Sequence, residues 1–167
     1  VRYAETYGSE GDPAIPYAHQ YRDYLIRAFN ADKPYGRFVQ EQVAGDILFP
    51  HTRDGVEALG FISAGPWDFI GHAEVPESKT DGMIARLLDR DDMVSNVCNT
   101  FLSLTVQCAR CHNHKFDPIS QVDYYAMKAI FAGVQHGERP TRPIGTESRE
   151  QQINAVKEEL ARVDDAL

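Results

Sequence analysis

Two cysteines and a histidine stand close together in the run Cys108-Ala109-Arg110-Cys111-His112. Cysteines at this spacing lie about one helical turn apart, so both thiols can add to the vinyl groups on one edge of a porphyrin. The imidazole of the next residue then faces the iron. The spacing therefore predicts covalent attachment of haem c, with Cys108 and Cys111 as thioether anchors and His112 as the proximal iron ligand.

The same residues leave two other kinds of chemistry open. Together with His112 and His114, the Cys-x-x-Cys pair can contribute to a zinc site, but closed structural sites need four ligands, often in two separated pairs. No second pair is evident, since His136 is isolated and Cys98 belongs to a helix face. A redox-active dithiol is the third option, although a preceding strand and a helix N-terminus favour that chemistry and this pair follows a helical pattern.

Polar residues beside the motif are candidates for supporting roles in a haem site. Arg110 and Lys115 are candidates for ion pairs with the haem propionates, because charge-assisted hydrogen bonds are strong, and the alternative is that both are solvated surface charges. His114 is too close along the chain to reach the opposite face of a porphyrin. We therefore expect it near a propionate or hydrogen-bonded behind a ligand, where such contacts orient the ligand and tune its potential.

The sixth iron position decides between two haem functions. Two strong axial ligands would make the protein an electron-transfer module, whereas an open position would allow peroxide, oxygen or substrate chemistry, as in a haem-dependent oxidoreductase. The remaining histidines and the methionines lie outside the motif, and the sequence does not select one of them as the sixth ligand.

Composition limits the class of protein that carries this motif. The chain has 167 residues, 17 Lys and Arg against 25 Asp and Glu, a formal net charge of −8 and 43% hydrophobic residues. A chain of this size can build a core without disulfides, and three cysteines cannot all pair within it. The acidic balance gives no field for phosphate backbones, so nucleic acid is not an expected partner. No run is long and apolar enough to predict a transmembrane segment.

Helical periodicity accounts for the elements before the motif. Apolar spacing predicts a helix over residues 17–29, a second short helix ended by Gly45 as a C-terminal cap, and a third over 54–62. Glycines and prolines over residues 65–76 then indicate a long loop that carries Trp67.

The strongest helical pattern begins at Thr80 and leads into the motif. Its apolar face consists of Ile84, Leu87, Leu88, Val94, Cys98, Phe101, Leu102 and Thr105. Cys98 on this face is predicted to be a small buried hydrophobe. The acidic residues 89–92 leave open whether this is one helix, or two with Asp91 or Asp92 capping the second.

After the motif, Ser120 and Asp123 predict a capping box at the start of a helix that Gly133 ends. No stretch alternates with a period of two, so the fold class is mainly α, with long loops. Residues 137–146 indicate a linker, and residues 147–167 an amphipathic helix. Its apolar positions over 153–167 fit a coiled-coil seam with a partner as well as a helix packed on its own domain.

The run from Phe101 to Pro118 resembles the planctomycete-type secreted cytochrome-like domain family, a domain of unknown function. The similarity continues through Arg2-Tyr3-Ala4-Glu5-Thr6, Tyr21-Arg22-Asp23-Tyr24, Ile26-Arg27-Ala28-Phe29-Asn30, Lys33-Pro34-Tyr35, Gln42-Val43-Ala44-Gly45-Asp46 and Asp123-Tyr124-Tyr125. The chain departs from the family pattern at Ser103 and Gln107, where the family usually has Gly, and at Asn113, where it usually has Asp.

The resemblance implies an irregular, helical, cytochrome c-like haem domain over residues 1–136. It also implies export, to the periplasm or the extracellular space, in a multidomain protein with a redox partner domain or protein. The chain starts at Val1 without a methionine. We therefore expect a processed protein or a piece of a longer one. The resemblance also implies that residues 147–167 start a helical insertion.

Overall fold

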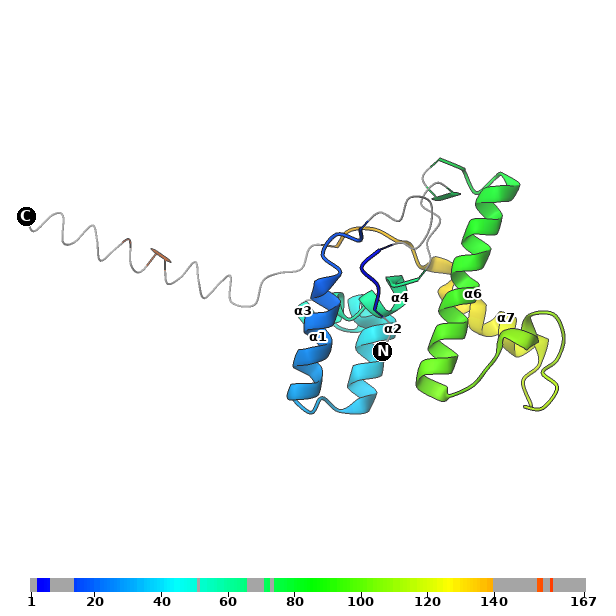
Figure 1. The fold of residues 1–167 in the computed structure, drawn as a ribbon, viewed down its shortest axis with the longest axis horizontal. Coiled ribbons are helices and arrows are strands. Elements are labelled where there is room, and N and C mark those ends of the chain that lie inside the picture. The colour runs from blue at the N-terminus through cyan, green and yellow to red at the C-terminus, as the bar shows by residue number, and fades with distance from the viewer. Residues whose placement is uncertain are drawn as a thin grey trace, which may run out of the picture.

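The fold is mainly helical, as the periodicity predicts (Figure 1). The structure is a computed structural model that describes residues 3–6, 14–50, 52–65, 71–72, 74–139, 153–154 and 157. The α-helices are α1 (His19–Asn30), α2 (Tyr35–Leu48), α3 (Arg53–Glu57), α4 (Gly60–Ser63), α6 (Thr80–Leu102) and α7 (Gln121–Ile130). Two 3-10 turns are η1 (Gln107–Arg110) and η2 (Phe131–Gly133). The predictions for Trp67, and for most of the linker and the helix over 147–167, fall outside the described residues.

The helices form two groups that share one core. Figure 1 shows α1 to α4 on one side of the molecule and α6, η1 and α7 on the other. The buried cluster contains side chains of both groups, among them Tyr24 of α1, Val97 of α6 and Tyr124 of α7. The rings of Phe61 and Phe101, with centroids 4.8 Å apart, pack across the boundary between the groups. The segment that carries the motif is therefore packed against this shared core, through Val106 and Ala109.

One face of α1 supplies much of this core. Tyr21, Tyr24, Leu25 and Ala28 are buried at the spacing that the sequence predicts. The two buried tyrosine hydroxyls reach α2, where Tyr21 donates to Gln42 at 2.8 Å and Tyr24 donates to Glu41 at 3.0 Å. The ends of the predicted face behave differently, because Tyr17 and Phe29 are exposed. The buried face of α1 is therefore shorter than the predicted face, and its two tyrosine hydroxyls hydrogen-bond to polar side chains of α2.

Gly45 does not cap α2, which continues to Leu48. Its role is the close approach of α2 to α3, since a Cβ at Gly45 would overlap the carbonyl oxygen of Gly55. The backbone of α2 departs from helical geometry at Ala44, with φ −147° and ψ 36°. The predicted helix over 54–62 is divided into α3 and α4, with a turn at residues 58–59 between them.

A partly buried network of charges links α1, α2 and α3. Asp54 accepts hydrogen bonds from Arg27 and Lys33, each at 2.8 Å. Lys33 also pairs with buried Glu41, and Arg27 pairs with buried Glu57. Burial alone would raise the pKa of Asp54, but the hydrogen bonds from Lys33 and Arg27 outweigh it and hold that pKa below its ordinary value.

Helix α6 is continuous, so neither Asp91 nor Asp92 caps a second half. Val94 and Cys98 are buried as predicted, together with Met93 and Val97. The predicted face is wrong at its last apolar residue, Leu102, which is exposed. Its first part is wrong as well, because the side chains of Ile84, Leu87 and Leu88 are exposed. The buried positions in that part of the helix are the small residues Gly82 and Ala85. Close packing there is made by small side chains, which a search for large apolar residues does not detect.

Ser103 ends α6 in the left-handed conformation, with φ 55° and ψ 31°. The backbone N–H of this residue bonds the carbonyl of a preceding turn, at Cys98. Left-handed C-terminal positions are usually glycine, because a Cβ is strained there. This left-handed residue turns the chain from α6 into the motif.

Candidate functional site

The Cys-x-x-Cys motif begins in η1 and ends at Cys111, the residue after it, between α6 and α7. Val106 and Ala109 are buried, whereas Cys108 and Cys111 are exposed free thiols. The backbone N–H of Cys111 donates to the carbonyl of Cys108 at 3.3 Å, which closes the turn. Side chains three residues apart in a 3-10 turn eclipse one another. The two cysteines therefore leave the same side of the turn, while Ala109 anchors its other side in the core.

His112 is exposed directly after this turn. Its Nδ1 lies 2.7 Å from the backbone carbonyl oxygen of Asn113. A carbonyl oxygen can only accept, so Nδ1 must carry the hydrogen and donate it. The neutral ring then has its lone pair on Nε2, which is the form in which histidine binds a metal.

His114 uses its ring differently, and only 10% of its side chain is exposed. Its Nδ1 accepts the backbone N–H of Asp117 at 3.0 Å, and its backbone N–H donates to the carbonyl of Ile119 at 2.8 Å. The Asp117 carboxylate lies 3.2 Å from the same Nδ1. The neutral ring therefore holds the loop after the motif in shape, with its hydrogen on Nε2.

Arg110, the fourth residue of η1, forms an ion pair with Asp91 of α6. Asp91 is buried and also accepts the Tyr124 hydroxyl at 2.6 Å and the Lys128 ammonium at 2.7 Å, both from α7. Burial and the hydrogen bond to Asp91 raise the pKa of Tyr124. One carboxylate thus joins the motif turn to the two helices beside it.

The sequence interpretation of Asp91 as a cap missed this role. Asp91 precedes Val94 by three residues and Cys98 by seven, so it shares their helix face. A carboxylate on a buried face requires partners of opposite charge. The place of Asp91 on the same helix face as Val94 and Cys98 was therefore the feature of the sequence that indicated an internal ion pair.

Backbone groups of the motif are tied to α7 as well. The Arg110 carbonyl accepts hydrogen bonds from Gln121 Nε2 at 3.0 Å and from the Tyr125 hydroxyl at 3.2 Å. Asn113 Oδ1 accepts the backbone N–H of Gln121 at 2.9 Å. Asn113 therefore contacts the first residue of α7 through its side chain, and it contacts His112 through its main chain.

The predicted capping box at the start of α7 is confirmed. Ser120 Oγ accepts the N–H of Asp123 at 3.1 Å, and Asp123 Oδ2 accepts the N–H of Ser120 at 2.8 Å. Hydrogen bonds from the Ser120 side chain and backbone lower the pKa of Asp123. The box fixes where α7 begins, and with it the position of the groups that hold the motif.

A family comparison covers this whole region. Residues 1–136 match the family model PSCyt2, which is described as a protein of unknown function (DUF1549). The chain belongs to the PSCyt2 family. Comparisons with curated proteins and with solved structures give no match to it. Among the residues that the structure describes, no helix of this PSCyt2 chain has the length and apolarity to cross a membrane.

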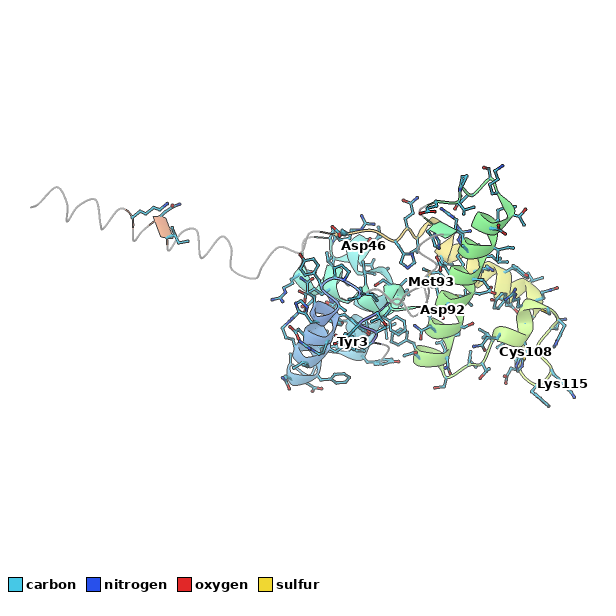
Figure 2. The ribbon with its side chains drawn as sticks, turned by 45° about the horizontal axis from the view of Figure 1, so that its top comes forward. Tyr3, Asp46, Asp92, Met93, Cys108 and Lys115 are labelled. Carbon is cyan, nitrogen blue, oxygen red and sulfur yellow. The ribbon has the colours of Figure 1, made fainter. Side chains whose placement is uncertain are left out.

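Lys115 lies at the outer edge of the PSCyt2 domain. Figure 2 shows it near Cys108, on the side of the molecule away from Tyr3. Its ammonium nitrogen is 5.4 Å from the centroid of the Phe116 ring, and Phe116 is 85% exposed. The ammonium group of Lys115 therefore lies beside an exposed aromatic ring, whereas Arg110 pairs with the carboxylate of Asp91.

Other chemically capable residues of the PSCyt2 domain lie outside the motif. Cys98 is buried in α6, where burial raises the pKa of its thiol. His72, Asp89 and His136, which the sequence does not link, come together at the N-terminal half of α6. Within the described part of the chain, no three His, Cys, Asp or Glu side chains already stand at coordination distance.

Proposed function

We propose that this PSCyt2 domain attaches haem c through Cys108 and Cys111 and binds the iron through His112. We further propose that it transfers electrons within a larger exported protein. The observation that carries the proposal is the hydrogen bond from His112 Nδ1 to the Asn113 carbonyl, beside two exposed thiols on one side of η1. It leaves the Nε2 lone pair for a metal, next to the two groups that would form thioethers.

The proposed residues fit a haem in their chemistry. Bound haem supplies a one-electron iron couple. His112 would hold the iron, and the Asn113 carbonyl would keep its ring in the ligating tautomer and raise its basicity. The large side chains of Phe116, Val122 and Tyr125 are exposed around the motif, and they offer apolar surface for the macrocycle to cover.

The geometry favours haem over the zinc alternative. A structural zinc site built on the motif would need His114 as a ligand besides the two thiolates and His112. His114 Nδ1 instead accepts the Asp117 N–H, and the neutral ring then carries its hydrogen on Nε2. Zinc binding would require the loop over 114–119 to break these bonds, whereas haem attachment leaves them in place.

The decisive experiment is expression with periplasmic haem-maturation machinery, followed by a pyridine haemochrome spectrum of denatured protein. We expect covalent haem in the unaltered chain and in Cys98→Ala, which removes the buried thiol outside the motif. We expect none in Cys108→Ser/Cys111→Ser. Absence of covalent haem from folded, matured protein would refute the proposal, and one zinc per chain that is lost in Cys108→Ser would establish the alternative.

The role of His112 needs a separate readout. We expect His112→Ala to alter the visible spectrum and shift the potential of any haem that still attaches, because the proximal ligand is gone. His19→Ala is the matched control, since His19 is exposed on α1, far from the motif in sequence. An unchanged spectrum in His112→Ala would assign the iron ligand to another residue. Binding of carbon monoxide to the reduced protein would show an open sixth position and favour a haem enzyme over electron transfer.

A further inference from the structure

Two histidines and an aspartate from three separate segments meet beside α6. His72 Nε2 lies 2.7 Å from Asp89 Oδ2, and His136 Nδ1 lies 3.9 Å from the same oxygen. The centroids of the two imidazole rings are 6.2 Å apart. Residues 71–72, the middle of α6 and the chain after η2 each supply one of these side chains. The three together are called the His-Asp-His cluster below.

The His-Asp-His cluster is separate from the motif. Asp89 and Asp91 are two positions apart on α6, which places their side chains about 200° apart around the helix axis. Asp91 faces Arg110 and α7, so Asp89 faces a different direction. Met93, one turn after Asp89, lies on the side of α6 away from Cys108 (Figure 2). A ligand at the cluster would therefore not contact the motif.

The three side chains are largely withdrawn from solvent. Their exposed fractions are 14% for His72, 11% for Asp89 and 18% for His136. Burial lowers the pKa of His136, so its imidazole is kept in the neutral form that binds metals. Burial raises the pKa of Asp89, because its carboxylate loses solvation, and a bound cation would offset that loss.

The distances suit a shared metal ion after a small adjustment. Bonds of about 2.0–2.2 Å to nitrogen and oxygen place neighbouring ligand atoms of a tetrahedral zinc about 3.3–3.6 Å apart. The two separations from Asp89 Oδ2, 2.7 and 3.9 Å, lie on either side of that range. Side-chain shifts of roughly half an ångström would bring each of these two separations into that range. His72 Nε2 would exchange its close contact with Asp89 Oδ2 for a bond to the metal.

The surroundings leave room for further ligands. A cleft of about 590 Å³ borders the His-Asp-His cluster, and it is lined in part by Glu77, Arg86 and Arg90. Both guanidinium groups have partners in the protein: Arg86 pairs with Glu77, and Arg90 donates to the Ala132 carbonyl at 3.1 Å. Water can therefore complete the coordination from the cleft.

We propose that His72, Asp89 and His136 bind one divalent transition-metal ion of the zinc or ferrous class, independently of any haem. Imidazole ligands select such ions over Mg²⁺ or Ca²⁺, and a single carboxylate is common beside them. The ion would join residues 71–72 and the chain around His136 to α6.

Metal binding is measured by titrating Zn²⁺ into the Cys108→Ser/Cys111→Ser chain, in which the motif cannot bind haem or zinc through thiolates. We expect one Zn²⁺ per chain, a higher melting temperature, and visible absorption bands when Co²⁺ replaces it. Asp89→Asn and His136→Gln in that background should weaken Zn²⁺ binding at least tenfold, because each removes a ligand. His19→Gln, in an exposed position, should leave it unchanged.

Two results would overturn the site: no saturable Zn²⁺ or Co²⁺ binding in this background, or binding that Asp89→Asn and His136→Gln leave unchanged. Far-UV circular dichroism checks that each variant is folded. If Asp89→Asn loses structure, His136→Gln decides, since His136 lies outside the helices. Because the background cannot attach haem, either failure would leave the proposed haem function untouched.

Discussion

Replacing Asp91 by asparagine should be among the most damaging single substitutions near the motif. The change keeps the shape of the side chain and an acceptor for the Tyr124 hydroxyl, but it removes the charge that faces Lys128. Lys128 is 7% exposed, so its ammonium would be left buried without its carboxylate. Removing one partner of a buried pair costs about 3–5 kcal/mol. Arg110 adds little to this cost, because its side chain is 43% exposed.

The lower end of that range, about 3 kcal/mol, is the expected loss in free energy of unfolding, since the asparagine side chain could still accept the Tyr124 hydroxyl. With a urea m-value of about 2 kcal/mol/M, the midpoint of unfolding falls by about 1.5 M. Circular dichroism at 222 nm in a urea titration measures the shift. The matched control is Asp32→Asn, an exposed position with φ 47° where asparagine is well tolerated, and its midpoint should not move.

A second substitution separates the charge from the shape. Lys128→Met in the Asp91→Asn background removes the stranded ammonium and keeps an apolar side chain of similar length. The double variant should recover at least half of the lost stability, because a buried pair replaced as a whole is often neutral. A stranded charge is refuted as the cause if Asp91→Asn shifts the midpoint by no more than Asp32→Asn does. It is equally refuted if the double variant is no more stable than Asp91→Asn.

The backbone and the charge network give three further predictions. Gly45→Ala should destabilise the domain by several kcal/mol, because the added Cβ would overlap the Gly55 carbonyl. The control is Gly36→Ala in the same helix, where a Cβ meets open space, and it should stabilise the domain by up to about 1 kcal/mol. Equal urea midpoints for the two variants would contradict this prediction. Ser103→Gly should stabilise by about 1 kcal/mol through relief of a left-handed serine, and a lower melting temperature would contradict it. Asp54, whose pKa is lowered on folding, contributes stability that is present above its unfolded pKa of about 3.9 and is lost as pH falls through the folded value. The gap in urea midpoint between the unaltered chain and Asp54→Asn should therefore be constant from pH 7 to pH 5 and shrink below about pH 4; a gap that widens in acid would refute the assignment.

Local patterns in the sequence carry much of the fold. The period of Tyr21, Tyr24 and Ala28 finds α1, and Ser120 with Asp123 finds the start of α7. These features depend on residues within one or two turns of each other, so the sequence displays them directly. The burial of Cys98 is confirmed for the same reason.

Features that depend on distant partners could not be predicted in this way. Gly45 has the residue type of a helix cap, and its contact with Gly55 is visible only once α3 is placed against α2. Asp91 and Asp89 are neighbours in one acidic run, yet they face different partners: α7 and η1 for Asp91, His72 and His136 for Asp89. A run of acidic residues on a helix is expected to be solvent-exposed, unless the basic residues that pair with it from other elements are known.

Some residues of the motif segment hold the turn against the core, and the side chains of others are exposed to solvent. Ala109 is fully buried and Arg110 pairs with Asp91, so these two residues fasten η1 to the core. The residue before this pair, Cys108, and the two residues after it, Cys111 and His112, are exposed. In a structural zinc site the ligands themselves provide the fastening, and the domain needs the metal to fold. Here protein contacts already hold the turn, so its two thiols and its imidazole remain available to an external group such as the proposed haem.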